Sequence, residues 1–487
     1  MKQVCRVYST DLSYAGVVSI HARFSTSHLR KLPCRARVLA KCPSASAIDF
    51  LPPKLDTPMS TFSPPLNSDE IPSVLPTSCD DEETSKCMGA ILGAMCGNVL
   101  GAPVQNDRHW VVMKRWPDGL TDFWRFDVGP DAVPFGHYTG DFSLLLATTK
   151  SLVTSASCSA PDIAKALSEL TEAEQHASRN YSPYARLVLT ALSEPGVRLA
   201  SIPYLAEKFL NATTSRRSHI TSDRSEQEPF GPSDNGAAAR ILPVALAFRN
   251  KSVPQLFSAV HEACSFSHAH TIGMEGARVA AATAHWLIQQ QRPATASDTV
   301  EAAAGKLPDH PVESGPEALL KYLLEKIAMT DDMRGKLKLM QKRMFQMDKV
   351  RSWRQMYETT EWSTLVSVHS SLTRHDYATS GTEAVAVALW CLVTNWCRPE
   401  QAVIVSATLA GSVPVTSQIT GGFAGTLHGL DWIPERWLKN LENGVDGRDQ
   451  VLELARGIAG FDSLVVLQRE DDPDFLVDLV EENVENN

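Results

Sequence analysis

The feature that most constrains this fold is a run of closely spaced small residues near the C-terminal end of the chain. In "ATLAGSVPVTSQITGGFAGTLHGLDWIPERW" at 407–437, these residues are placed so that two helices can approach closely, and Pro434 then opens a new helix. A second such stretch, "GAILGAMCGNVLGAPV" at 89–104, follows four acidic residues that suit the positive end of a helix dipole. The sequence therefore predicts helices that pack with their backbones close together.

The rest of the folded region also has helical periodicity. Apolar residues recur at three-to-four spacing in segments such as "NGAAARILPVALAFRN", "MEGARVAAATAHWLIQQQ", "TEAVAVALWCLVTNW" and "DQVLELARGIAGFDSLVV". Alternating β-branched runs are rare, and no repeat of solenoid length is evident. We expect an all-α fold, with a single large helical domain over residues 85–468.

The ends of the chain differ in composition from this domain. Residues 1–42 contain eight Lys or Arg and one acid, Asp11, with many Ser and Thr, which is typical of an organelle-import presequence. We expect import into the mitochondrial matrix, with plastid import or a plain basic tail as alternatives. Residues 43–84 contain eight Pro and many Ser and read as a linker, and residues 469–487 form an acidic tail.

Overall composition excludes several classes of protein. The ten Cys are scattered without CxxC or metal-finger spacing, which favours free thiols in a reducing compartment over a disulfide framework. No apolar run reaches the length of a transmembrane helix, so no membrane span is expected. The net charge of −10 decides little about nucleic acids because the charge is unevenly distributed.

One segment is strongly basic. Residues 334–354, "RGKLKLMQKRMFQMDKVRSWR", contain eight basic residues, one acid and interleaved Met and aromatic residues. An amphipathic basic helix of this kind can contact RNA phosphates and stack on bases, whereas a solvated helix face is the simpler alternative. The candidate RNA-binding residues are Lys336, Lys338, Lys342, Arg343, Arg351 and Arg354, together with Arg216 and Arg217 in the polar stretch 211–236.

Five ordered motifs carry a family resemblance. They are "GAILGAMCGNVLGAPVQ" (89–105), "YTGDFSLLLATTKSL" (138–152), "SDNGAAARILPVALAF" (233–248), "SFSHAHTIGMEGARVAAA" (265–282) and the segment at 407–437. Their order and spacing resemble the ADP-ribosylglycohydrolase family, also called the crystallin J1 family, over nearly all of residues 87–440. The resemblance implies an all-α globule with two magnesium ions in a central cleft, where bonds between ADP-ribose and an acceptor are hydrolysed.

The metal-binding positions of that family are largely replaced in this chain. Where the family has "GDALGAPxE", Asn98 and Gln105 stand in place of the Asp and the Glu. The family's "YTDDT" becomes "YTGDF", which keeps only Thr139 and Asp141, and its "GDTDT" becomes "GSVPV" at 411–415. Magnesium requires several oxygen ligands in near-octahedral order, usually with more than one carboxylate. We therefore expect no metal, no cofactor and no catalytic residue of the two-metal type.

The positions that would bind the ligand are better kept. "SDNGAAAR" matches the family's "GNGxxMR" loop, in which Asn235 and Gly236 would present backbone N–H groups to a pyrophosphate. "SHAH" matches the family's Thr-His and places His268 beside phosphates or ribose. For each residue the simpler reading is structural: a turn glycine, or a core histidine. The candidate ligand-binding residues are Thr139, Asp141, Asn235, Gly236, Arg240 and His268.

Three functions remain open at this point. The first is a catalytically inactive ADP-ribosylglycohydrolase-like protein that binds RNA in mitochondria. This combination is similar to the guide-RNA-associated proteins of the kinetoplastid RNA-editing machinery, which implies a paralogous partner subunit and an RNA 5′ phosphate in the former ADP-ribose cleft. The second is a divergent hydrolase of ADP-ribose adducts, and the third is a structural, crystallin-like protein. DNA binding is not implied.

Overall fold

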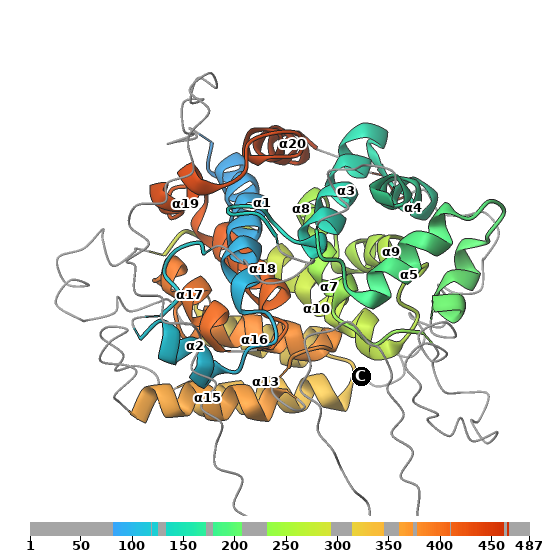
Figure 1. The fold of residues 1–487 in the computed structure, drawn as a ribbon. Coiled ribbons are helices and arrows are strands. Elements are labelled where there is room, and N and C mark those ends of the chain that lie inside the picture. Colours follow the sequence, from blue (N-terminus) through green and yellow to red (C-terminus); the bar gives the residue numbers. More distant parts are fainter. Residues whose placement is uncertain are drawn as a thin grey trace, which may run out of the picture. The chain divides into compact units, whose positions relative to one another are not determined.

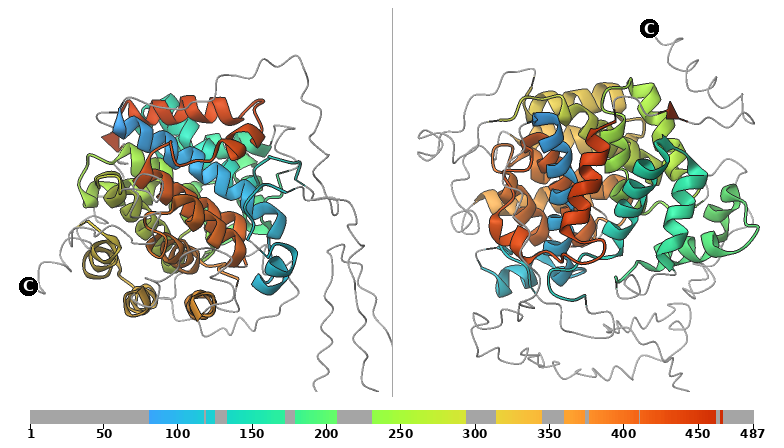
Figure 2. Two further views of the ribbon diagram at one scale, coloured as in Figure 1. Left: turned by 90° about the vertical axis from the view of Figure 1, so that its left-hand side faces the viewer. Right: turned by 90° about the horizontal axis from the view of Figure 1, so that it is seen from above.

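The computed structural model describes residues 81–117, 119–124, 133–171, 179–206, 231–293, 314–344, 360–373, 377–409, 411–461 and 465–466. Two helices form the centre of this structure: α1 (Glu82–Gly101) and α18 (Val413–His428) lie side by side (Figures 1 and 2). Both are buried along nearly their whole length. The two segments whose small residues were singled out in the sequence are therefore partners in the core.

Glycines at every fourth position of α1 explain how closely these helices pack. A Cβ on Gly93 or Gly97 would overlap backbone atoms of α18, and one on Gly89 would overlap Gly429 directly after that helix. A Cβ on Gly101 would lie 2.8 Å from the carbonyl oxygen of Val413. The contacts run in opposite directions along the two helices, since Gly89 meets Gly425 and Gly97 meets Ser417. The pair is therefore antiparallel, and only glycine fits at this row of positions.

The start of α1 follows ordinary capping chemistry. Asp81 is the N-cap residue and accepts a hydrogen bond of 2.8 Å from the backbone N–H of Thr84. Glu82 and Glu83 in the first turn suit the positive helix end.

The helical segment Glu82–Val104 is long and apolar enough to cross a membrane, a possibility that the sequence analysis did not raise. However, 94% of its most apolar 18-residue window is buried inside the protein. It is a core helix in this fold.

The remaining helices surround this pair. Those packed nearest to it are α3 (Gly140–Ser155), α10 (Thr271–Ile288), α16 (Gly381–Val393), α17 (Pro399–Leu409) and α20 (Arg448–Ala459). The outer helices are α2 (His109–Arg115), α4 (Ala160–Ser168), α5 (Pro183–Ser193), α9 (Val253–Cys264), α12 (Pro316–Tyr322), α13 (Asp331–Met344), α15 (Thr360–Leu372) and α19 (Glu435–Asn440). Short turns of helix are η3 (Ala102–Val104), η4 (Glu169–Thr171), η6 (Leu199–Ser201) and η7 (Leu323–Ile327).

The all-α prediction is confirmed, with two local differences. The stretch after residue 236 was expected as one helix, but it divides into α7 (Gly236–Arg240) and α8 (Leu242–Ala247), because Pro243 cannot continue the hydrogen bonding of a helix interior. The end of the last expected helix instead forms a short strand, β2 (Val465–Val466), which pairs in parallel with β1 (Ser157–Cys158). The helix stops before it, at Gly460.

Buried thiols agree with the sequence prediction. The six cysteines within the described ranges are all buried, and none of them forms a disulfide bond: Cys87, Cys96, Cys158, Cys264, Cys391 and Cys397. Burial raises the pKa of each thiol, for example to about 12 for Cys87. They act as small apolar core residues and not as reactive groups.

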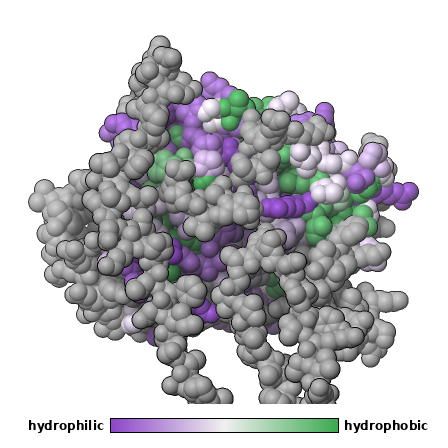
Figure 3. Space-filling view, in the orientation of Figure 1, coloured by the Kyte–Doolittle hydropathy of each residue, from purple (hydrophilic) through white to green (hydrophobic). Residues whose placement is uncertain are grey.

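On the face drawn in Figure 3, hydrophilic and hydrophobic residues of the described part are interspersed in small patches.

Candidate functional site

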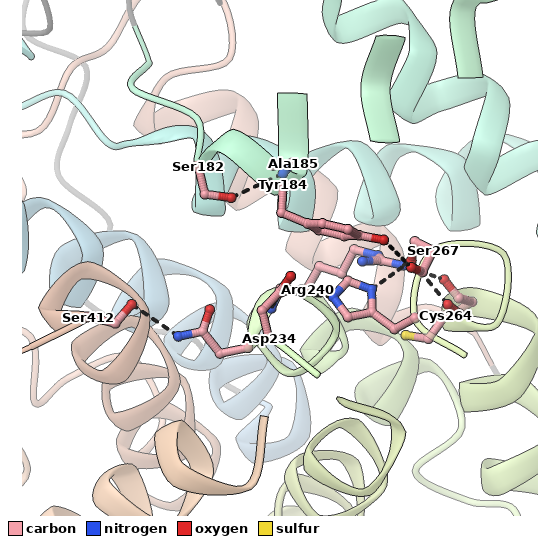
Figure 4. Close-up of polar contacts among 12 residues, drawn as sticks. Ser182, Tyr184, Ala185, Asp234, Arg240, Cys264, Ser267 and Ser412 are labelled. Atoms are coloured by element: carbon pink, nitrogen blue, oxygen red, sulfur yellow. Dashed lines mark hydrogen bonds and ion pairs between the residues drawn. The ribbon is translucent and has the colours of Figure 1, made fainter. Parts of the chain in front are cut away.

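A small pocket lies where α3, α5, α7 and the segment after α9 meet (Figure 4). One wall is apolar and is formed by α3, α4 and α5, while the other is polar. The pocket has a volume of about 20 Å³, and one water molecule needs roughly 10–15 Å³ by the same measure. The lining residues are Asp141, Leu144, Leu167, Ser182, Tyr184, Ala185, Val188, Leu189, Asp234, Asn235, Gly236, Arg240, Ser267 and His268.

Five of the six candidate ligand-binding residues therefore meet at one place. Asp141, Asn235, Gly236, Arg240 and His268 all line the pocket, although they are separated by up to about 130 positions along the chain. Thr139 lies beside the pocket, and its hydroxyl is 3.5 Å from Oδ2 of Asp141. The structure thus brings the predicted set together.

Thr139 is bound to a network of amide side chains. Asn98 accepts a hydrogen bond of 2.7 Å from the backbone N–H of Thr139 and donates one of 2.9 Å to its hydroxyl. The same amide donates to Oε1 of Gln418 at 2.9 Å, and Gln418 donates to the carbonyl of Ala239 at 2.7 Å. Because Asn98 is a donor in two of these bonds, an Asp at this position could not complete the network.

Asp141 is the one family carboxylate that remains, and its environment is unfavourable to charge. Burial raises the pKa of Asp141 to about 6, and the nearby charge of Asp234 adds to this effect, while the hydrogen bond from Thr139 opposes it. The residue is therefore partly protonated near neutral pH. Its described contacts contain no cation that balances the ionised form.

Asp234 stands where the family loop begins with glycine, and it occupies the groups expected to bind phosphate. Its Oδ1 accepts the backbone N–H of Gly236 at 2.7 Å and lies 2.9 Å from Nε2 of His268. Burial works to raise the pKa of Asp234, but the charge and hydrogen bond of His268 and the N–H of Gly236 hold it below its ordinary value. This carboxylate is therefore ionised in the pocket.

His268 and Arg240 are joined through Ser267. The Ser267 hydroxyl lies 2.9 Å from Nδ1 of His268, accepts from Arg240 at 2.5 Å and is 3.0 Å from the carbonyl of Cys264. Figure 4 shows Tyr184 reaching across the pocket, where its hydroxyl donates to the carbonyl of Ser267 at 2.7 Å. These side chains form a hydrogen-bonded network behind the pocket wall.

In this structure the groups expected to bind phosphate make hydrogen bonds within the protein. The N–H of Gly236 is not open, because it donates to Asp234. The side-chain amide of Asn235 donates to the carbonyl of Ala378 and to the hydroxyl of Ser412, both at 3.0 Å, and so ties α7 to the segments before α16 and α18. Two carboxylates at the same pocket add electrostatic repulsion, so this arrangement disfavours a phosphate.

At the positions where the family has magnesium-binding residues, this chain has residues that pack against, or hydrogen-bond to, neighbouring side chains. A Cβ at Gly140 would lie 2.7 Å from Cγ of Tyr181, so the ring of Tyr181 takes the space of the missing carboxylate. Phe142 is fully buried and packs edge-on to Tyr138, with ring centroids 4.9 Å apart. Of the other replaced positions, Gln105 accepts a hydrogen bond of 3.3 Å from Asn180.

The last family motif is equally changed. Gly411 has φ of +94°, and a Cβ there would lie 2.6 Å from the carbonyl oxygen of Tyr377. Val413 and Val415 are buried in the core. Within the described ranges there is no group of three or more His, Cys, Asp or Glu side chains that could hold a metal ion. The residues present do not fit two magnesium ions.

The predicted RNA-binding residues lie elsewhere. On α13, Lys338 and Lys342 are exposed, Lys336 pairs with Asp332 at 2.5 Å, and Arg343 is half-buried. None of them lines the pocket. The apolar side chains Met340 and Met344 are buried in the core, so they are not a stacking surface. Arg216, Arg217, Arg351 and Arg354 lie outside the described residues.

Sequence reasoning missed three residues of the site. Asp234, Ser267 and Tyr181 were not singled out, although the first two lie inside quoted motifs. For Asp234 a signal existed, because an Asp two residues before Gly236 can accept its backbone N–H. Tyr181 had no such signal, since its contact with Gly140 depends on the fold.

Comparison with known proteins agrees with this architecture. The model of the ADP-ribosylglycohydrolase family matches residues 80–472. Comparison with curated proteins gave no match. Among solved structures, the chain is similar to an "ADP-ribosylglycohydrolase-related protein complex", with 19% identity and a TM-score of 0.49 over 78% of this chain and 99% of the other. Since the family match spans most of the sequence, the chain belongs to the ADP-ribosylglycohydrolase family.

Proposed function

We propose that this protein is a non-catalytic member of the ADP-ribosylglycohydrolase family that binds RNA. The lack of catalysis is supported by the packing of Tyr181 against Gly140, where a carboxylate would have to enter. The other carboxylate positions of the family hold Asn98, Gln105, Ser412 and Pro414, so Asp141 is the one carboxylate of the family set that remains. One carboxylate and one hydroxyl do not supply the ligands of two magnesium ions.

The observation that favours RNA is the outer face of α13. Arg334, Lys338 and Lys342 are exposed and follow each other at intervals of four residues, so they lie on one side of the helix, about 6 Å apart along its axis. A row of cations at this spacing suits a phosphate backbone and carries no base specificity. Phosphates would thus be bound on this face and not in the pocket, whose carboxylates repel them.

The proposal includes a place in the cell and a partner. The basic composition of residues 1–42 supports import into the mitochondrial matrix, where the protein would act with a paralogous subunit in RNA processing or editing. Fusion of residues 1–42 to a fluorescent reporter tests the import step. Cytosolic fluorescence of the fusion would contradict it.

RNA binding is tested with the purified full chain by fluorescence anisotropy of a labelled single-stranded RNA at several salt concentrations. Replacement of Arg334, Lys338 and Lys342 by Gln should weaken binding and make the slope of log K against log salt shallower by about 2, since each phosphate contact contributes roughly 0.7. The matched control replaces three exposed basic residues elsewhere, Lys165, Arg198 and Arg456, and keeps the same net charge. Equal effects of both triple variants would mean that RNA binding depends on the overall charge of the protein and not on the face of α13.

Two further outcomes decide between the alternatives. Release of ADP-ribose from a modified peptide in the presence of Mg²⁺ would support the divergent hydrolase and overturn the non-catalytic proposal. Tighter binding of 5′-triphosphate RNA than of 5′-hydroxyl RNA would show that a phosphate enters the pocket after all. Absence of any RNA binding would leave the structural, crystallin-like role.

A further inference from the structure

A second surface of the protein combines exposed tryptophan with positive charge. Of the large apolar side chains that are exposed within the described ranges, two are tryptophans only 14 positions apart: Trp110, which is 59% exposed, and Trp124, which is 37% exposed. Both lie on or just after α2. We define the Trp110 surface as Trp110, Lys114, Arg115, Trp116 and Trp124.

Packing of α2 does not need Trp110. The helix already buries Val112 and Met113 against the core, and its start is held by a hydrogen bond of 3.0 Å from the N–H of Asn106 to the carbonyl of Gly411. Trp110 and Lys114 are four residues apart and so share the outer side of the helix. Leaving an indole in water forgoes the stabilisation that burial of a large apolar side chain provides, so this exposed ring is a candidate for binding.

The rest of the surface continues this combination. Trp124 packs edge-on against Trp116 with ring centroids 5.3 Å apart, and the guanidinium of Arg115 lies over the Trp116 ring at 5.9 Å. Among the described acids nearby, Asp107 pairs with Arg115 at 3.2 Å, and Asp122 pairs with Arg436 at 2.7 Å, while Asp118 lies outside the described residues. Lys114 is exposed and makes no ion pair within the described part of the chain. Among the described residues of this surface, Lys114 therefore supplies the positive charge that is open to a ligand.

We propose that the Trp110 surface binds unpaired bases of single-stranded RNA, with Trp110 as a stacking platform and Lys114 on the adjoining phosphate. An indole face stacks on any base, and a cation one helical turn away can reach the backbone of the same strand. Within α13 the buried residues Met340 and Met344 offer no stacking group, and the aromatic residues Phe345 and Trp353 of the same basic segment lie outside the described residues. This inference rests on the proposed RNA-binding function and adds to it the preference for single strands.

The test compares single-stranded and duplex RNA. Anisotropy is measured with an oligouridylate of about 16 nucleotides, the upper end of ordinary single-strand sites, and with a duplex of equal length. Trp110→Ala should weaken binding of the single strand about tenfold and leave the duplex unchanged, because paired bases cannot stack on the indole. Trp110→Phe should restore most of the affinity. Lys114→Gln should make the salt slope for the single strand shallower by roughly 0.7.

Tyr204→Ala is the matched control, because Tyr204 is also an exposed aromatic residue, at 55%, but lies after η6. It should bind like the wild type, and thermal melts of all variants confirm that they fold. If the wild type binds RNA and Trp110→Ala binds it equally well, the stacking surface is wrong while RNA binding stands. If the wild type binds no RNA, the proposed function fails as well. A change of oligomeric state in Trp110→Ala with unchanged RNA affinity would identify a protein interface instead.

Discussion

At the scale of single residues, two substitutions at the family's metal-binding positions are accompanied by neighbouring side chains that fit them. Gly140 is accompanied by Tyr181, whose ring occupies the space beside it, and Asn98 is accompanied by Gln418, whose amide completes its hydrogen bonds. At these two positions a neighbouring side chain fits the substituted residue. Restoring one carboxylate would therefore conflict with its surroundings.

The first prediction concerns Gly140. Gly140→Ala should lower the free energy of unfolding by about 1–3 kcal/mol, because its Cβ would lie 2.7 Å from Cγ of Tyr181. Urea unfolding measures this change. In the background of Tyr181→Ala the same substitution should cost much less, since the ring is absent. Equal costs in both backgrounds would mean that the ring does not fill this space.

The second prediction concerns Asp141 and pH. Its folded pKa is about 6 and its ordinary value is 3.8, so the folded state binds the proton more tightly than the unfolded state. This residue therefore contributes stability that increases as the pH falls from about 7 towards 4. Asp141→Asn should remove that contribution, so that its stability relative to the wild type is highest near pH 7 and declines towards pH 4. A difference that is constant with pH would contradict the raised pKa.

At the scale of elements, the packing of α1 against α18 is the central contact of the fold. Gly425→Ala should cost about 3 kcal/mol or more, because its Cβ would overlap the carbonyl of Gly89 in the facing helix. Gly335→Ala on α13 is the matched control, since a Cβ there meets nothing within 4 Å. That substitution should stabilise the protein by about 0.5–1 kcal/mol through helix propensity. Chemical denaturation compares the two variants.

The loop before α3 is held by a buried ion pair. Arg179 donates to Glu442 at 2.5 and 2.7 Å, lies 3.9 Å from the ring centroid of Tyr138, and donates to the Tyr138 carbonyl at 3.1 Å. Burial works to raise the pKa of Glu442, but hydrogen bonds from His137 and Arg179 hold it below its ordinary value of 4.5. The pair thus joins the start of α3 to the segment after α19.

The fourth prediction follows from the lowered pKa of Glu442. A depressed folded pKa contributes stability that is present above about pH 4.5 and is lost as the pH falls through the folded value. Glu442→Gln should therefore be less stable than the wild type near neutral pH, with a difference that shrinks below about pH 4. Arg179→Ala should cost more, about 3–5 kcal/mol, because it leaves a buried carboxylate without its cation. Unfolding free energies at several pH values test both variants.

At the scale of the whole molecule, the absent ligand set has a thermodynamic consequence. A protein that binds Mg²⁺ in its folded state gains about 2.7 kcal/mol at a concentration 100 times the dissociation constant, and its melting temperature rises accordingly. For this chain we expect the midpoint to be the same in Mg²⁺ and in chelator at matched ionic strength. A midpoint that rises with the logarithm of the Mg²⁺ concentration would contradict this expectation.

The sequence by itself determined the fold class and showed which carboxylates of the family pattern are replaced. Helical periodicity and the glycines of the two central segments are local properties, and they remain readable because close helix packing admits only small residues. Replacement of carboxylates by Asn98, Gly140 and Pro414 is equally local, since none of these residues carries a charged oxygen in any fold. The placement of Asp141, Asn235 and His268 around one pocket followed from the family resemblance.

Only the tertiary structure decided what the pocket favours. Whether the N–H of Gly236 is open depends on the rotamer of Asp234 and on His268, which lies 34 positions along the chain from Asp234. The burial of Met340 and Met344 depends on the helices packed against α13, and the exposure of Trp110 on the absence of a packed neighbour. These are contacts between distant parts of the chain, and a pattern of residue types at one segment does not specify its neighbours in space.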